Sequence, residues 1–427
     1  MSRQLRWMRL DNAAKIYPAA KRRRWSNIFR LSATLTEDVD PEILQSALDK
    51  AARRFPSMAV RLRNGIFWYY LEELKEPPVL QDERGYPLSR MPFDDIRKCA
   101  IRVICYKNRI ACEFFHAITD GNGGLVFLKT LTAEYLRLKY GVDIPCTDGV
   151  LDMDDAPIFD ELDDSFLKND GPVNASRKEP TAYALRGTRE IDGYNNLITG
   201  ALDSAEVLKL AKKYGVTLTV FIVSVMIFSI LNIQERRVPK RKHRKPVKVL
   251  VPVNLRKIFD SKTLRNFVLY VTPGIDPRLG DYTFEEILKS VHHQMGGEIT
   301  RQNMASKIAA NVNSERVFII KIMPLFIKNF VMKTIYNIVG EKKSCITISN
   351  LGNVSVPDEW RKFVSRMDFV LGAPADNPNN CGVLSYNGTL NINITRTIKE
   401  AELEREFFCN LRKLGLNVKI ESNRRDL

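Results

Sequence analysis

The sequence lacks the cysteine and histidine patterns that usually build disulfide frameworks and metal sites. Its seven cysteines are scattered without Cys-x-x-Cys spacing, and only four histidines occur in 427 residues. This cysteine pattern predicts free thiols in a reducing cytoplasm. His292 and His293 are adjacent on an expected helix and point in different directions, so they form no metal pair. We therefore expect a cytoplasmic protein without a metal.

Long uninterrupted apolar runs are also missing. The longest run, from Val216 to Ile233, contains five polar residues, Thr217, Thr219, Ser224, Ser229 and Asn232. This composition favours a buried helix over a membrane span. The first ten residues alternate arginine with apolar residues and have no continuous apolar core, so they do not resemble a signal peptide.

Acidic residues are too few to balance the basic ones. The chain has 66 lysines and arginines against 50 acidic residues, a formal net charge of +16, which predicts attraction to anions. Two basic runs, Lys21–Arg24 and Lys240–Lys245, lack regular aromatic interleaving and a helix-turn-helix, so nucleic acid is not the expected partner. Gly121-x-Gly-Gly also lacks the Gly-x-Gly-x-x-Gly and Lys-Ser/Thr patterns of a phosphate loop.

The chain is too long for one ordinary hydrophobic core. With 427 residues, 44% of them hydrophobic, two domains of about 200 residues each are the natural expectation. Residues 146–190 are rich in aspartate and proline, which predicts a solvated crossover linker, ordered only where it lies against the two halves. This linker would join an N-terminal subdomain, 1–145, to a C-terminal subdomain, 191–427.

Both halves repeat a plan of strand, helix and sheet. Turn residues predict hairpins around Asn64-Gly65, Lys107-Asn108 and Asn387-Gly388. Helices are expected after Asp40-Pro41, in the long apolar run, and at 284–300, 315–339 and 399–414. The expected fold is therefore α/β, with mixed, mostly antiparallel sheets and helices packed on them.

One stretch places a histidine, a carboxylate and glycines between an expected strand and helix. Residues 109–115 have strand character, His116 follows directly, and Asp120 and Gly121 precede a helical period. Such a turn can hold a neutral imidazole where a proton must be removed, since histidine titrates near neutral pH. We expect Asp120 to pair with a distant cation and Gly121 to adopt a backbone angle that a side chain would forbid. A purely structural turn is the alternative.

His116-x-x-x-Asp120-Gly121 resembles the active-site motif of the acyltransferase superfamily that contains chloramphenicol acetyltransferase, condensation domains and alcohol acetyltransferases. Val251-Pro-Val-Asn-Leu-Arg256 resembles a strand end of condensation domains, Ile348-Ser-Asn-Leu-Gly352 a segment of alcohol acetyltransferase-like members, and Leu10–Pro18 the opening of bacterial members. Asn266-Phe267 stands about where the family places its next strand. The resemblance implies two related subdomains around an active-site tunnel. It also implies a pair between Asp120 and Arg256, in which a guanidinium can grip a carboxylate with two hydrogen bonds.

The activity implied by this resemblance is acyl transfer from acetyl-CoA or another acyl-CoA to a small-molecule alcohol or amine, by a monomer. His116 would be the general base. Ser349 or Asn350 can serve as the oxyanion donor, and a strand-end cap is an equal alternative for both. The phosphates of CoA are expected on the second basic run, for which a solvated loop is the alternative; its cations are Lys240, Arg241, Lys242, Arg244 and Lys245.

Two departures from the family keep other functions open. Phe115 stands where condensation domains usually have a second histidine, and the Asp-Phe-Gly-Trp-Gly segment of the plant branch is absent. Condensation between carrier-bound partners is therefore a second reading, and a non-catalytic anion-binding protein a third. Four cysteines in apolar strands are expected in the core and not as nucleophiles; they are Cys105, Cys112, Cys345 and Cys381.

Overall fold

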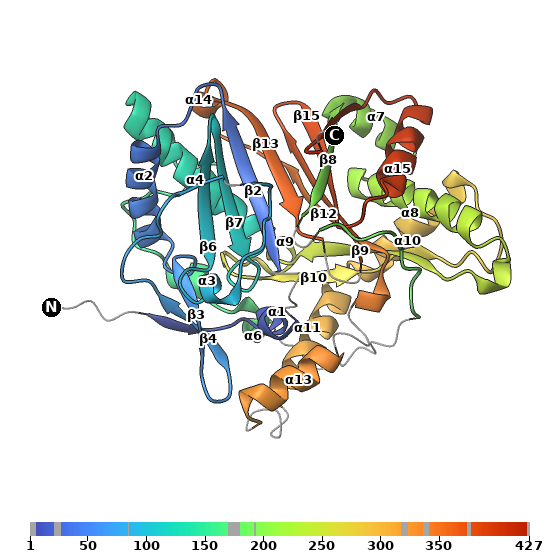
Figure 1. The fold of residues 1–427 in the computed structure, drawn as a ribbon, viewed down its shortest axis with the longest axis horizontal. Coiled ribbons are helices and arrows are strands. Elements are labelled where there is room, and N and C mark those ends of the chain that lie inside the picture. Colours follow the sequence, from blue (N-terminus) through green and yellow to red (C-terminus); the bar gives the residue numbers. More distant parts are fainter. Residues whose placement is uncertain are drawn as a thin grey trace.

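Two α/β halves lie side by side in the structure (Figure 1). The coordinates are a computed structural model, which describes residues 6–20, 27–83, 85–169, 180–191, 194–316, 323–335, 341–373 and 377–424. Each half has its own main sheet and its own hydrophobic core, and a small third sheet has the strand order β1–β4–β3. The basic run Lys21–Arg24 lies outside the described residues.

The sheet of the first half has five strands in the order β13–β2–β7–β6–β5. Their bounds are β2 (Ile28–Leu35), β5 (Gln81–Asp82), β6 (Ile101–Tyr106), β7 (Arg109–Phe115) and β13 (Val364–Leu371). The β6–β7 hairpin turns at Lys107, whose φ of 49° suits the predicted tight turn. Two helices cover this sheet: α2 (Pro41–Arg54), capped by Asp40 as predicted, and α4 (Gly121–Tyr140).

Strand β13 comes from the second half of the sequence but completes the sheet of the first. It pairs antiparallel with β2, with Phe369 opposite Leu31. In Figure 1 the orange strand β13 lies beside the blue strand β2. The sheets therefore do not follow a simple division of the chain into two consecutive parts, because residues 364–371 cross between the halves.

The second half has an eight-stranded mixed sheet in the order β10–β9–β12–β14–β15–β8–β16, with β11 pairing on β9. Strand β12 is parallel to both of its neighbours, and the other pairings are antiparallel. The bounds are β8 (Asn196–Asp203), β9 (Val247–Asn254), β10 (Val268–Val271), β11 (Gly274–Ile275), β12 (Ile346–Asn353), β14 (Asn379–Tyr386), β15 (Thr389–Arg396) and β16 (Lys419–Ser422). The predicted turn between β14 and β15 is confirmed, since Asn387 and Gly388 have φ of 47° and 78°.

The long apolar run forms helix α8 (Leu218–Arg237) in the core of the second half. By length and composition this helix could cross a membrane, but 67% of its most apolar window is buried within the protein. It packs against β9 and three helices, α7 (Ser204–Lys213), α10 (Phe284–Glu298) and α15 (Glu402–Lys413). The prediction of a buried helix is therefore confirmed.

The acidic stretch between the halves is more ordered than a solvated linker. It contains the short helices α5 (Phe159–Leu162) and α6 (Ser165–Lys168). Glu161 is buried and accepts two hydrogen bonds from Arg54, of 2.7 and 2.9 Å. A bidentate pair with an arginine of helix α2 thus fixes this part to the first half. Residues 170–179 of the expected linker lie outside the described residues.

The helix expected at 315–339, with Pro324 interrupting it, is described only in part, because residues 317–322 and 336–340 lie outside the described residues. The structure has α11 (Arg301–Arg316) and α13 (Leu325–Ile335). Helix α11 was not predicted; it begins after Thr300, whose hydroxyl accepts a hydrogen bond from the amide of Asn303. Pro324 directly precedes α13, and its carbonyl accepts a hydrogen bond from the amide of Lys328 at 3.0 Å. The remaining elements are β1 (Trp7–Arg9), β3 (Val60–Asn64), β4 (Tyr69–Glu73), α1 (Ile16–Ala20), α3 (Phe93–Ile96), α9 (Arg256–Phe259) and α14 (Asp358–Arg361).

Candidate active site

His116 lies in the turn between β7 and α4, with its ring held between two aromatic side chains. Its backbone amide donates to the carbonyl of Asn27 at 2.8 Å. Tyr17 stacks on the imidazole with ring centroids 4.6 Å apart, and Phe29 meets it edge-on at 5.1 Å. Burial among these groups lowers the pKa of His116, because the charged form loses water. The imidazole is therefore neutral near pH 7.

Asn266 selects one tautomer of this imidazole. The Nδ1 atom of His116 lies 3.2 Å from Oδ1 of Asn266. An amide oxygen only accepts hydrogen bonds, so Nδ1 carries the proton and Nε2 keeps its lone pair. This is the protonation state that a general base requires.

Asp11 fixes the orientation of the Asn266 amide. One carboxylate oxygen of Asp11 accepts hydrogen bonds from the backbone amide of Asn266 at 3.1 Å and from its Nδ2 at 3.4 Å. The other oxygen lies 2.5 Å from Nη2 of Arg265. Complete burial raises the pKa of Asp11 to about 7, an effect that Arg265 partly offsets. The Nδ2 of Asn266 thus faces a carboxyl group, which leaves Oδ1 for the histidine.

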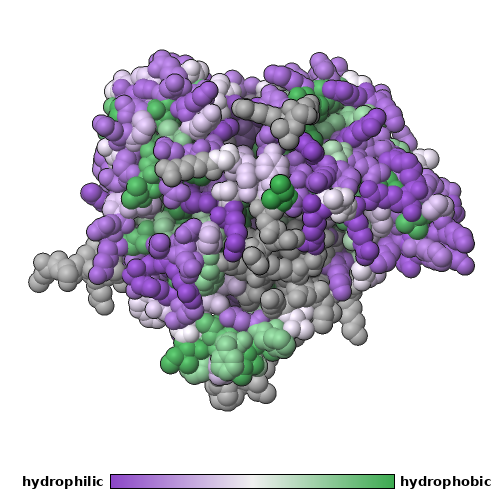
Figure 2. Space-filling view, in the orientation of Figure 1, coloured by the Kyte–Doolittle hydropathy of each residue, from purple (hydrophilic) through white to green (hydrophobic). Residues whose placement is uncertain are grey.

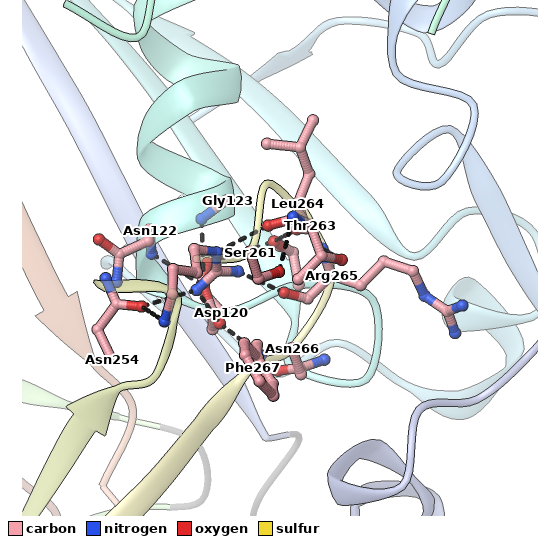
Figure 3. Close-up of polar contacts among 12 residues, drawn as sticks. Asp120, Asn122, Gly123, Asn254, Ser261, Thr263, Leu264, Arg265, Asn266 and Phe267 are labelled. Atoms are coloured by element: carbon pink, nitrogen blue, oxygen red, sulfur yellow. Dashed lines mark hydrogen bonds and ion pairs between the residues drawn. The ribbon is translucent and has the colours of Figure 1, made fainter. Parts of the chain in front are cut away.

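Asp120 accepts four hydrogen bonds and joins the two halves (Figure 3). Its Oδ1 accepts from the backbone amides of Asn122 and Gly123, both at 3.1 Å, and so caps α4. Its Oδ2 accepts from Nη1 of Arg256 and from the backbone amide of Phe267, both at 2.9 Å. Asp120 is only 1% exposed. A buried carboxylate with four donors sets the position of the turn that carries His116.

Arg256 meets Asp120 as predicted, but with one hydrogen bond and not two. Its Nε donates to the carbonyl of Thr263 at 2.7 Å and its Nη2 to that of Arg265 at 2.5 Å. The guanidinium therefore also shapes the loop that leads to Asn266. Because three of its nitrogens reach three different groups, the fork of the side chain fits this site in a way that lysine cannot.

Gly121 does not have the backbone angle that the sequence suggested, and lies instead in close contact with the other half. It has no positive φ and is the first residue of helix α4. A Cβ atom at this position would lie 2.9 Å from Cδ2 of Leu351. Gly123 is tighter still, since its Cβ would lie 2.1 Å from the carbonyl oxygen of Leu264. Close packing between the halves explains both glycines, and a special backbone angle at Gly121 does not.

A pocket of about 290 Å³ opens beside His116 and is lined by both halves. Ser349 and Asn350 in the middle of β12 also line it. The side chain of Asn350 is engaged, since its Nδ2 donates to Thr219 at 3.0 Å and its Oδ1 accepts from the amide of Gly352 at 2.8 Å. The geometry thus places both oxyanion candidates in the pocket of His116.

Similar proteins identify this arrangement of two halves at the level of the fold. No protein-family model and no curated protein matches the chain. A condensation domain of the calcium-dependent antibiotic synthetase is 13% identical with a TM-score of 0.63, covering 98% of this chain and 100% of that one. Trichothecene 15-O-acetyltransferase from Fusarium sporotrichioides is 12% identical with a TM-score of 0.59, covering 95% and 94%.

A wax ester synthase/diacylglycerol acyltransferase from Marinobacter aquaeolei is 13% identical with a TM-score of 0.56, covering 96% of this chain and 100% of that one. The chain has the chloramphenicol acetyltransferase-like fold. The resemblance inferred from the motif is thus confirmed for the fold, over nearly the whole chain.

The basic run Lys240–Lys245 lies away from the pocket of this acyltransferase fold. The run lies before strand β9 and Arg256 lies after it. Because the eight residues of β9 extend roughly 25 Å, the strand separates the run from the site. Arg241 forms an ion pair with Asp281, and Arg244 pairs with Glu235. None of these six residues, all of which the structure describes, lines the pocket of His116. The CoA-binding role of the run stays a prediction.

The cysteines lie where the sequence placed them. All seven are free, and Cys105, Cys112, Cys345 and Cys381 are buried. Burial raises the pKa of the Cys345 thiol to about 12, so it does not ionise near neutral pH. In the part of the chain that the structure describes, no group of three histidine, cysteine, aspartate or glutamate side chains could hold a metal ion.

Three residues at this site were not assigned a role from the sequence. Tyr17 and Asp11 lie in the opening segment Leu10–Pro18, and Asn266 precedes Phe267; both segments carried the resemblance. The segments were therefore recognisable, but their contact with His116 depends on residues more than 90 positions apart. No local pattern reports such a contact.

Proposed function

We propose that this protein transfers an acyl group, most simply acetyl, from a CoA thioester to an alcohol, with His116 as general base. The observation that carries this proposal is the tautomer of His116. Its Nδ1 proton is held by Asn266, which leaves Nε2 as a proton acceptor beside a pocket built from both halves. Its lowered pKa keeps this nitrogen unprotonated near neutral pH.

In the proposed reaction, the hydroxyl of the acceptor donates its proton to Nε2 of His116 as its oxygen attacks the thioester carbonyl. A tetrahedral intermediate forms, with negative charge on the former carbonyl oxygen. Its collapse breaks the carbon–sulfur bond and releases the thiolate of CoA, which takes the proton back from His116. The products are an ester and free CoA, and no covalent acyl-enzyme is needed.

Ser349 is the better of the two candidate oxyanion donors. Asn350 already uses its amide to hold Thr219 and the amide of Gly352, so it is better suited to shaping β12 where its pairing with β14 shifts register. Ser349 lines the same pocket and its hydroxyl can rotate toward a developing charge. Loss of one such donor costs about 100- to 1000-fold in turnover in an enzyme where it was measured.

The donor thioester is assigned to CoA because a similar structure, F. sporotrichioides TRI101, was solved with CoA and T-2; it is 10% identical with a TM-score of 0.59. Condensation domains share the fold equally well, so a carrier-protein thioester is the competing donor. The assay includes amines beside alcohols as acceptors.

The test is release of free thiol from acetyl-CoA in the presence of a panel of alcohols and amines. Acceptor-dependent release by the wild-type protein, lost in His116→Ala, would support the proposal. Release only from an acylated carrier protein would favour condensation. A folded protein that releases thiol from neither donor would point to the non-catalytic reading.

A further inference from the structure

Helix α13 carries two phenylalanines that are largely exposed to solvent. Phe326 and Phe330 are 75% and 73% exposed, and Ile327 and Val331 lie beside them at 40% and 38%. These residues form the apolar region at the lower edge of Figure 2. Because phenylalanine is costly to leave in water, an exposed cluster of this kind marks an interaction surface.

The β3–β4 hairpin extends this surface from the other half of the chain. Its turn exposes Ile66 by 77% and Phe67 by 40%. The backbone of α13 is fixed to this turn, since the amide of Leu325 donates to the carbonyl of Ile66 at 2.9 Å. Figure 1 shows the hairpin and α13 side by side at the bottom of the molecule. We call these six exposed residues the apolar tip: Ile66, Phe67, Phe326, Ile327, Phe330 and Val331.

Trp68 adjoins the apolar tip and has two lysines near its ring, of which Lys328 is itself buried. Trp68 is half-buried, with the ammonium of Lys328 3.2 Å and that of Lys15 5.3 Å from its ring centroid. Neither residues 64–71 nor residues 317–340 include an aspartate or glutamate, and the second stretch has three lysines. Phenylalanines at the tip with a half-buried tryptophan next to them are typical of a surface that meets a bilayer, because tryptophan favours the level of the headgroups.

We propose that the apolar tip docks this protein on the surface of an anionic phospholipid membrane. The tip is convex, because it projects beyond the rest of the molecule in Figures 1 and 2. A fluid lipid surface accommodates such a projection, whereas a protein partner would need a matching hollow. The net charge of +16 on the whole chain favours an anionic over a neutral membrane.

Membrane contact at this tip would reach the candidate active site through one helix. Helix α13 packs against α1, and α1 carries Tyr17, which stacks on His116. If the proposed acyl transfer is correct, docking would bring the pocket next to acceptors dissolved in the bilayer. This consequence rests on the proposed function, whereas the docking itself does not.

Flotation with phospholipid vesicles tests the docking without any substrate. Vesicles of phosphatidylcholine, with and without phosphatidylserine, are mixed with the wild-type protein and with Phe326→Ser/Phe330→Ser. The matched control is Val79→Ser/Leu279→Ser, whose side chains are 76% and 79% exposed but lie outside the tip. Unchanged thermal melting would establish that each variant is folded.

We expect the wild-type protein to float with phosphatidylserine vesicles, more weakly at high salt, and the control to match it. The double phenylalanine variant should partition about 100-fold more weakly, since each of the two phenylalanines removed from lipid costs about a tenfold change. No flotation of the wild type, or equal flotation of the phenylalanine variant, would overturn the proposal. Dimers that the phenylalanine variant abolishes, without vesicle binding, would assign the tip to a second copy of the chain. Flotation without acyl transfer would leave the docking intact and refute only the proposed function.

Discussion

Replacement of Asn266 by alanine would remove the acceptor that holds the Nδ1 proton of His116. The imidazole would then lose one hydrogen bond of 3.2 Å and the restraint on its tautomer, while Tyr17 and Phe29 would still hold the ring. A hydrogen bond of this kind contributes about 0.5–1.5 kcal/mol, which corresponds to a change of about 2- to 13-fold. We therefore expect the turnover number of Asn266→Ala to fall by about 10-fold.

The same variant in a His116→Ala background separates positioning from general damage. If Asn266 acts only through His116, its removal should cause no further loss once the imidazole is gone. The assay is thiol release from acyl-CoA with a saturating acceptor, for both single variants and the double variant. A further 10-fold loss in the double variant would refute the reasoning, because Asn266 would then act independently of the histidine.

Three other predictions concern the rest of the site. Arg256→Ala should lower the free energy of unfolding by about 3–5 kcal/mol in a denaturant titration, because it leaves the buried Asp120 carboxylate without its cation. A loss below about 1 kcal/mol would show that the pair contributes little to stability. Ser349→Ala should reduce turnover by about 100-fold or more at unchanged stability if it is the oxyanion donor, and wild-type turnover would return that role to another group. Replacing the exposed Lys240 and Lys242 with serine should raise the Michaelis constant for acyl-CoA. The effect should be largest at low ionic strength, where charges act beyond about 10 Å. An unchanged Michaelis constant at low salt would identify the run as a solvated loop.

Local sequence patterns correctly predicted the turns, helix caps and helices that depend on residues close together in the chain. The hairpin turns at Lys107 and Asn387, the cap of α2 and the buried helix α8 follow from residue types within a few positions, and the structure contains them. The strand, turn and helix around His116 belong to the same class.

Features set by distant residues were missed or misread. Strand β13 pairs with β2 across more than 300 positions, and no periodicity indicates which sheet a strand will join. Asp11 and Asn266 come together only after both halves have folded. Gly121 was recognised as special, but its reason is the close approach of Leu351 from the other half, which a backbone argument does not contain.

The claim that His116 is the general base is tested most directly by the pH dependence of turnover with acyl-CoA as donor. The profile of the wild-type protein is compared with that of His116→Ala. Burial lowers the pKa of His116 below its usual 6.5, so the base stays active as the pH falls to that value and is lost only at lower pH. The wild-type profile should therefore decline below pH 6.5, and folded His116→Ala should turn over at least about 100-fold more slowly without this decline. Near-wild-type turnover by a folded His116→Ala would contradict the assignment of His116 as the base.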